Sequence, residues 1–246
     1  MTTLLPPTPG NTGCGPKIER LQNAQALADA VTALVTTAVL QGVQRHGHAN
    51  LIFSGGGTPE IFLPQVACLS LPWDQVSNVL SDERWVGEDS PHSNTAMLRR
   101  TLLSQPGPSR ANFIPLKNAA ATAHDGVSRT RSGLPPLDQR YDLALLGMGN
   151  DGHFASLFPG TPRLAELLAL DNTERIVAVP PPTTASPNVE RISMTLAEIK
   201  RSERVVLVLQ GAAKLAVLTR AWLTGDALRT PVVALGNVEV LWCPAD

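Results

Sequence analysis

Short apolar runs alternate with polar or glycine-rich turns along most of this chain. The runs at residues 51–53, 141–146 and 205–209 are mostly apolar, which is typical of strands that are buried on both faces of a sheet. Segments with helical spacing lie between such runs, and strands that alternate with helices favour a parallel sheet. The sequence therefore predicts an α/β fold in which a mostly parallel sheet is covered by helices on both faces.

The first helix is predicted from apolar residues that recur at spacings of three and four between Leu27 and Val39. We expect this helix to start near Ile18 and to end near Gly47. The other expected elements are strands at residues 79–80, 112–116, 175–179, 191–195 and 238–242, a helix that starts near residue 93, and a helix over residues 211–224.

The first 16 residues differ in composition from the rest of the chain. They contain four prolines and three glycines and show no periodicity, so we expect a loose arm at residues 1–16. No internal repeat and no linker divides the remainder. Residues 17–246 are therefore predicted to form a single α/β catalytic domain.

The charge balance argues against some classes of partner. The formal net charge is −1, so the chain offers no basic footprint for nucleic acid. No segment approaches the roughly 18 apolar residues of a membrane span, and the first residues lack the charged and apolar regions of a secretory signal. We expect a soluble cytoplasmic protein that binds neither nucleic acid nor a membrane.

Cysteine and histidine spacing predicts no metal site. Cys14, Cys68 and Cys243 match no zinc or redox spacing and are expected as reduced thiols. His46 and His48 form H-x-H without an evident third ligand, which argues against a catalytic metal.

Residues 147–152 fit G-x-G-x-x-G, the fingerprint of dinucleotide-binding sites. Such sites need an acidic residue at the end of the next strand, whereas the next expected strand here ends in Pro180. The alternative is that the glycines bring the backbone close to a ligand and present Asp151 and His153 on a turn at the start of a helix. Histidine suits proton abstraction from water near neutral pH, so His153 is a candidate general base that Asp151 would orient. A capped helix start with a surface histidine fits the spacing as well.

Residues 54–59 form a glycine turn between an expected strand and a helix, with Ser54, Gly55, Gly56 and Thr58 as candidate ligand-binding residues. Backbone N–H groups at such a helix N-terminus bind phosphate. The turn lacks the lysine of a P-loop, which argues against a nucleoside triphosphate. A simple tight turn explains the same residues equally well.

Charged side chains follow other expected strands. Arg84 comes just after the apolar run at residues 79–80, where it could pair with a phosphate or carboxylate, although a surface salt-bridge cluster is the simpler interpretation. Lys214 lies in the first turn of the expected helix at residues 211–224, and Asn94 and Arg191 lie near element ends. Because the carboxyl ends of parallel strands meet at one edge of a sheet, we expect these segments and the glycine turns to lie together there.

These segments together resemble the 6-phosphogluconolactonase family, part of the glucosamine/galactosamine-6-phosphate isomerase superfamily. The resemblance covers nearly the whole chain after the arm. Residues 54–59 look like the family's S-G-G-x-T-P turn, residues 82–94 like its D-E-R-x-V…D…S-N block, residues 146–160 like its hallmark G-M-G-x-D-G-H-x-A-S-L-F-P, residues 191–195 like its R-I-T/S strand, and residues 211–214 like its G-x-x-K helix start.

The resemblance implies a Rossmann-like fold with a small additional α/β element. It implies hydrolysis of 6-phosphoglucono-δ-lactone to 6-phosphogluconate, the second step of the oxidative pentose phosphate pathway, by a monomer without metal or organic cofactor. His153 would be the base that activates water, and Asp151 would support it. The small-molecule lactone would be bound by Ser54, Gly55, Gly56, Thr58, Asp82, Arg84, Asn94, Arg191 and Lys214, with the three cations handling the phosphate and orienting the lactone.

The chain departs from the family pattern at two positions. Gly57 stands where many members have serine, and Phe154 stands where threonine is common. These departures concern substrate contacts more than the reaction.

Two other functions stay open. Aminosugar-phosphate deaminases have D-E-Y and F-N-E-P where this chain has Arg84 and residues 156–159, so the chain lacks the carboxylate that would open the sugar ring. A non-catalytic sugar-phosphate-binding regulator is the second alternative, and the intact pair of Asp151 and His153 argues against it.

Overall fold

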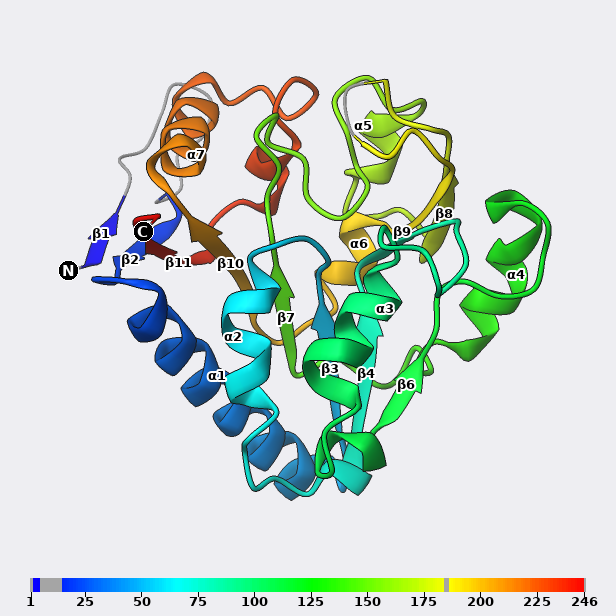
Figure 1. Cartoon of the computed structure of the whole chain (residues 1–246). Coiled ribbons are helices and arrows are strands. Elements are labelled where there is room, and N and C mark those ends of the chain that lie inside the picture. Colours follow the sequence, from blue (N-terminus) through cyan, green and yellow to red (C-terminus); the bar gives the residue numbers. More distant parts are fainter. Residues whose placement is uncertain (1, 5–14, 184–185, 246) are drawn as a thin grey trace.

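The computed structural model describes residues 2–4, 15–183 and 186–245 (Figure 1). Its centre is an eight-stranded sheet of order β1-β2-β11-β10-β7-β3-β4-β6. The described strand pairs of this sheet are parallel, except that β1 runs antiparallel to β2. The strands are β1 (Thr2–Leu4), β2 (Lys17–Arg20), β3 (Ala49–Phe53), β4 (Val76–Leu80), β6 (Asn112–Ile114), β7 (Leu143–Leu146), β10 (Val205–Gln210) and β11 (Glu239–Cys243).

The central strands β3 and β7 are buried along their whole length, which explains why their sequences are apolar without alternation. The connections from β3 to β4 and from β10 to β11 run in opposite directions across the sheet, so right-handed crossovers place α2 and α7 on opposite faces. The predicted α/β fold with a mostly parallel, Rossmann-like sheet is thereby confirmed. The helices are α1 (Ala24–His46), α2 (Pro59–Val66), α3 (Asn94–Leu98), α4 (Ala123–Gly133), α5 (Leu164–Leu167), α6 (Leu196–Ile199) and α7 (Ala212–Thr224), joined by short 3₁₀ or π turns at Trp73–Gln75, Arg99–Leu103, Pro108–Arg110 and Pro231–Leu235.

The predicted start of the first helix is wrong. Residues Lys17–Arg20 form strand β2, which pairs in parallel with β11, and Ile18 alone in it is buried. Helix α1 begins only after Asn23, whose side-chain oxygen accepts a hydrogen bond from the backbone N–H of Ala26 at 2.9 Å. The predicted end is confirmed, because Gly47 adopts the left-handed conformation that ends a helix.

Helix α1 also corrects the expectation that no segment approaches a membrane span. By length and composition alone it is long and apolar enough to cross a membrane. In the structure, its apolar stripe packs into the core and the helix lies along α2 (Figure 1). The buried residues of the stripe are Leu27, Ala28, Val31, Val35, Ala38, Val39 and Gly42.

A second sheet supplies the additional element that was expected. It has three strands in the order β5-β9-β8, all antiparallel, with β5 at Asp82–Arg84, β8 at Ile176–Val179 and β9 at Arg191–Met194. The charged segment Asp82–Arg84, which was placed after an expected strand, is therefore itself a strand. Because β5 pairs with β9, Arg84 lies opposite Arg191 in the register.

The predicted loose arm is partly wrong. Thr2–Leu4 forms the edge strand β1 against β2 and so belongs to the main sheet. Residues 5–14 of the expected arm lie outside the described residues.

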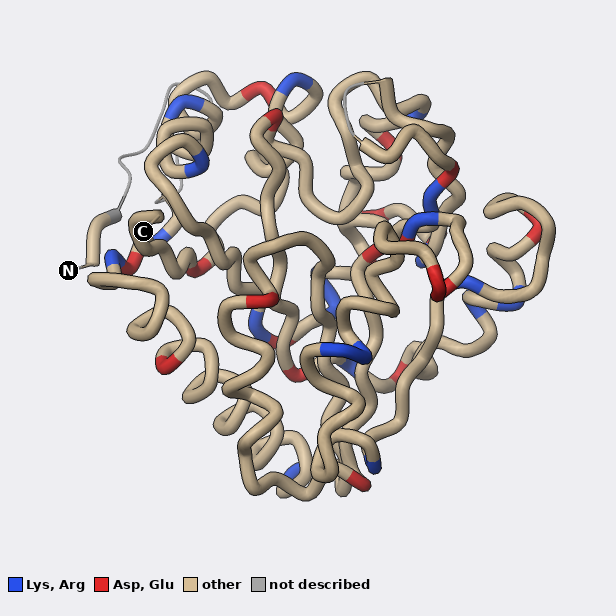
Figure 2. Tube along the Cα trace, viewed as in Figure 1, with Lys and Arg blue, Asp and Glu red and all other residues tan. Residues whose placement is uncertain are grey.

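Lysine, arginine, aspartate and glutamate are interspersed along the trace, with no long run of one sign (Figure 2).

Candidate active site

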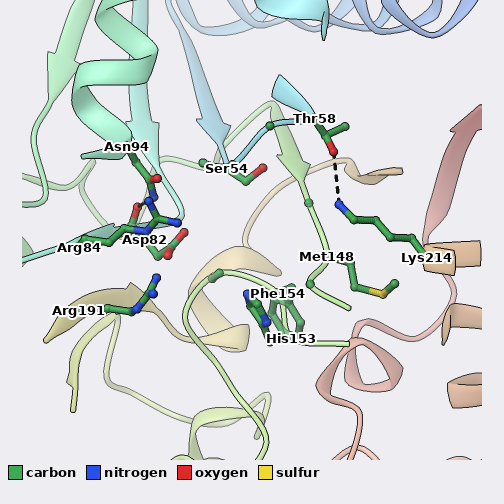
Figure 3. A pocket seen from close by; sticks show the side chains of 16 residues that line it. Ser54, Thr58, Asp82, Arg84, Asn94, Met148, His153, Phe154, Arg191 and Lys214 are labelled. Carbon is green, nitrogen blue, oxygen red and sulfur yellow. Dashed lines mark hydrogen bonds between the residues drawn. The ribbon is translucent and has the colours of Figure 1, made fainter. Parts of the chain in front are cut away.

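A cavity of about 200 Å³ opens where β3, β4 and β7 end (Figure 3). The glycine turns after β3 and β7 form two of its walls, and side chains from β5, β9 and α7 complete it. The structure thus brings the separate glycine-rich and charged segments together at one edge of the sheet, as expected from the topology. The lining residues are Ser54, Gly55, Gly56, Gly57, Thr58, Asp82, Arg84, Asn94, Gly147, Met148, Gly149, His153, Phe154, Ala155, Arg191 and Lys214.

The turn after β3 leads into helix α2, which begins at Pro59 directly after Thr58. The first N–H groups of a helix have no partner inside it and can face an anion. Gly55 is required by close approach, because a Cβ at this position would collide with the side-chain amide of Asn94. Asn94 is held in turn by its Nδ2, which donates to the backbone oxygen of Asp82 at 3.0 Å.

Lys214 reaches the glycine turn from the opposite wall (Figure 3). It lies in the first turn of α7, and its Nζ is 3.5 Å from Oγ1 of Thr58. Burial lowers the pKa of Lys214, because the charged ammonium is partly removed from water. A phosphate in the turn would restore the missing solvation of that charge.

Two arginines form a second cationic group beside Asp82. Arg191 is 2% exposed, and burial lowers its pKa, although the charge of Asp82 acts in the opposite direction. Arg191 donates from Nη2 to the backbone oxygen of Pro187 at 3.2 Å, and Arg84 donates from Nη1 to that of His92 at 2.6 Å. The Nε atoms of both arginines are buried and have no partner among the described residues, while both side chains line the cavity.

Glu83 fixes the strand that carries these groups. Its buried carboxylate accepts hydrogen bonds from the backbone N–H groups of Arg84, Asn94 and Thr95 at 2.7–2.8 Å. Burial raises the pKa of Glu83, and the three N–H donors act against that rise. Glu83 therefore joins β5 to the start of α3. This role could not be predicted from the sequence, where Glu83 is one of several neighbouring charged residues.

His153 presents its ring to the cavity from the loop after β7, and its side chain is 23% exposed (Figure 3). Its Nδ1 lies 2.5 Å from Oδ1 of Asp151. Because a carboxylate only accepts, Nδ1 of the neutral ring carries the proton and Nε2 is left as the basic nitrogen. Burial alone would raise the pKa of Asp151, but the hydrogen bond and charge of His153 outweigh it and lower that pKa.

One detail of this loop differs from the expectation. No helix starts at His153; the next helix, α5, begins only at Leu164. Asp151 is not among the residues that line the cavity; its contact with Nδ1 of His153 is the one that the expected supporting role requires. Gly149 fits against the ring, since a Cβ there would collide with the imidazole and lie 2.7 Å from Oδ1 of Asp151.

Sequence reasoning missed the apolar members of the site. Met148 and Phe154 line the cavity; Met148 carries no titratable group that would single it out, and Phe154 was noted only as a departure from the family pattern (Figure 3). Ser156 was also missed; its Oγ donates to Oδ2 of Asp82 at 2.6 Å and so ties the His153 loop to β5.

The arrangement suits general-base attack on an ester-like carbonyl in a molecule that also carries an anion. A histidine–aspartate pair can take a proton from water, and buried arginine N–H groups can stabilise an oxyanion. A glycine turn with a lysine can hold a phosphate. Within the described residues, no three His, Cys, Asp or Glu side chains lie together as a metal centre would need.

Comparison with known proteins gives three results. Residues 22–242 match the family described as glucosamine-6-phosphate isomerases/6-phosphogluconolactonase. The chain is 35% identical to a 6-phosphogluconolactonase of Caulobacter vibrioides over 92% of this chain and 97% of the relative, and 34% identical to one of Pseudomonas putida over 93% of each. A crystal structure of a 6-phosphogluconolactonase from Shewanella baltica OS155 superposes with a TM-score of 0.86 at 32% identity, over 93% of this chain and 97% of that one.

Proposed function

The chain belongs to the family of glucosamine-6-phosphate isomerases and 6-phosphogluconolactonases, and we propose on that premise that it hydrolyses 6-phospho-D-glucono-1,5-lactone to 6-phospho-D-gluconate in the oxidative pentose phosphate pathway. The single observation that carries this proposal is the set of relatives named 6-phosphogluconolactonase, which are 31–35% identical over more than nine-tenths of this chain. The pair of His153 and Asp151 at the cavity supplies the chemistry that this reaction needs.

His153 acts as the general base in the proposed mechanism. Its Nε2 takes a proton from water while the water oxygen forms a bond to the C1 carbonyl carbon of the lactone. The carbonyl oxygen becomes an oxyanion, which cationic donors stabilise; the guanidinium groups of Arg84 and Arg191, which line the cavity, are assigned to this. The tetrahedral intermediate then breaks the bond between C1 and the ring oxygen, and the leaving oxygen takes the proton from the imidazolium of His153.

The phosphate of the substrate is assigned to the glycine turn and Lys214. The distance of 3.5 Å between Nζ of Lys214 and Oγ1 of Thr58 supports this assignment, since one anion can contact both. Ser54, Gly55 and Gly56 add polar backbone groups to the same wall, while Asp82 and Asn94 lie on the side of the arginines.

The alternative of an aminosugar-phosphate deaminase has less support. Ser156 is fully buried and hydrogen-bonded to Asp82, at a place where deaminases have the F-N-E-P segment with its carboxylate. The relatives that are 31–35% identical to this chain are named as lactonases rather than deaminases. An assay for ammonia released from glucosamine 6-phosphate separates the two activities.

The direct test is hydrolysis of freshly generated lactone, followed as acid release at constant pH. The lactone also opens spontaneously, so the rate with protein is compared with the rate without it. We expect a large acceleration over background that is proportional to protein concentration. Tight binding of 6-phosphogluconate without acceleration would instead support a non-catalytic regulator.

We further propose that the protein acts in the cytoplasm as a monomer, without a metal or an organic cofactor. The reaction supports the last point, because a lactone is already an activated ester. Light scattering on the purified protein tests the oligomeric state, and activity after chelator treatment tests the metal.

A further inference from the structure

Phe158 contacts two groups of the site without lining the cavity itself. The centre of its ring lies 4.2 Å from that of the His153 imidazole, with 41° between the ring planes. Cζ of the Arg191 guanidinium lies 5.1 Å from the centre of the same Phe158 ring. Phe158 is 2% exposed, so both contacts are made away from bulk water.

The two contacts act on groups that have different tasks. His153 is the proposed base, whereas Arg191 is a buried cation with a donor that has no described partner. Both project toward the same cavity (Figure 3). An aromatic ring packed against an imidazole restricts the rotation of that ring, and a cation near an aromatic ring is attracted to it most strongly when both are desolvated.

The loop that carries Phe158 is held by other bonds as well. The backbone N–H of Ser156 donates to Oγ of Ser193 on β9 at 3.1 Å, and its Oγ donates to Asp82 on β5. A change at Phe158 therefore leaves the loop attached to the second sheet. Any effect on His153 or Arg191 then reports their orientation rather than the loss of the loop.

We propose that Phe158 is a positioning residue, which fixes the His153 imidazole and the Arg191 guanidinium relative to each other so that base and cation meet the same substrate. This inference rests on the proposed function for its kinetic part. Its binding part depends only on a sugar-phosphate ligand in the cavity. Because Phe158 has no polar atom, its role is the geometry of the two groups and not a step of the reaction.

The experiment uses Phe158→Leu, which keeps an apolar side chain but removes the ring, and Phe158→Tyr, which keeps the ring. We expect Phe158→Leu to lower kcat about ten- to a hundredfold and to weaken binding of 6-phosphogluconate about threefold to tenfold. Phe158→Tyr should recover most of both. Phe113→Leu is the matched control, because Phe113 has Arg99 at a similar distance of 5.4 Å but lies on β6 away from the cavity; it should leave kcat and binding unchanged.

A double-mutant cycle with Arg191→Lys measures whether Phe158 acts on ligand binding through Arg191. If Phe158 positions Arg191, the two changes together weaken 6-phosphogluconate binding by clearly less than the product of their separate effects. Wild-type kcat and binding in folded Phe158→Leu, or an equal defect in folded Phe158→Tyr, would overturn the inference. An absence of lactone hydrolysis in the wild type would sink the proposed function alone, because the binding cycle still decides the role of Phe158.

Discussion

Oδ1 of Asp151 lies 2.5 Å from Nδ1 of His153, and the carboxylate stands outside the cavity into which the imidazole projects. The same oxygen accepts a hydrogen bond from the backbone N–H of His153 at 3.2 Å. The carboxylate thus holds both the ring and the backbone N–H of His153. Asp151 supports the imidazole through Nδ1, and Nε2 of His153 is left to act as the base toward the ligand.

Replacement of His153 by alanine should lower kcat for the lactone about 10²- to 10⁴-fold, because the base is lost while the binding groups stay. Asp151→Asn should cause a smaller loss, about ten- to a hundredfold, since the amide no longer stabilises the imidazolium. Acid release corrected for spontaneous opening measures both. His46→Ala changes an exposed histidine on α1 and serves as the control. Near wild-type turnover in His153→Ala would rule out its role as base.

Lys214 should make ligand binding sensitive to alkaline pH. Burial lowers its pKa below the ordinary value of 10.5, so its positive charge is lost as the pH rises through that lower value. The affinity for 6-phosphogluconate, measured by calorimetry, should therefore fall as the pH rises, and the fall should begin below the ordinary pKa of 10.5. Lys214→Arg should remove this fall, because a guanidinium stays charged throughout the range.

Lys214→Ala should weaken 6-phosphogluconate binding about tenfold or more near neutral pH, the usual worth of a charged hydrogen bond. Lys200 offers a matched control, because burial also lowers its pKa but its Nζ donates to the backbone oxygen of Leu235, outside the cavity. Equal affinities in Lys214→Ala and Lys200→Ala would contradict the phosphate assignment.

Gly149→Ala should reduce kcat about a hundredfold while the protein stays folded. The added Cβ would occupy space that the His153 ring now fills, so the imidazole must move away from Asp151. Gly133→Ala adds the same atom at an ordinary distance of 3.8 Å from Cγ2 of Ile114 and should have no effect on rate. Thermal unfolding shows whether both variants fold, and unchanged kinetics in Gly149→Ala would mean that the ring is not confined there.

Glu198→Gln should destabilise the fold by about 3 kcal/mol at neutral pH. Glu198 is 1% exposed and accepts hydrogen bonds from Tyr141 and Arg175 at 2.6 Å and from Arg201 at 3.1 Å. Without its charge the two arginines lose their counterion. Glu166→Gln, which breaks an exposed pair with Arg163, should change the melting temperature little and is the control.

The pH dependence of that difference follows from the direction of the shift. Burial alone would raise the pKa of Glu198, but Arg175, Tyr141 and Arg201 outweigh it and lower that pKa below the ordinary value of 4.5. The stabilisation is therefore complete above pH 4.5 and is lost as the pH falls through the lowered pKa. Urea unfolding of wild type and Glu198→Gln should converge in strongly acidic buffer; a constant difference would contradict the assignment.

The main sheet could be predicted from the sequence because its central strands are buried on both faces. No residue of β3 or β7 is exposed, and this complete burial is what their mostly apolar sequences indicate. The second sheet could not be predicted in the same way, because β5 consists of charged residues and its stability comes from pairing with β9, more than a hundred positions later in the chain. β2 was mistaken for the start of a helix because its four residues are too few to show a period.

The site could be predicted as far as the polar side chains that follow expected strands. Ser54, Arg84, His153 and Lys214 follow expected strands, and the topology alone brings them to one edge. The sequence could not show that Asp151 contacts Nδ1 of His153 from outside the cavity. It also could not show that Phe158 packs against both His153 and Arg191. Those facts depend on how a loop without helix or strand folds back on itself, and no local pattern encodes such a path.

The cavity draws its walls from residues as far apart in the chain as Ser54 and Lys214. A chain that refolds from denaturant must therefore close its longest loops before any substrate can bind, and contacts of such large sequence separation form slowly. Recovered turnover would then appear late, after the buried strands have paired. The recovery of lactone hydrolysis during refolding would therefore measure how fast the complete fold forms, in addition to measuring the activity of the enzyme.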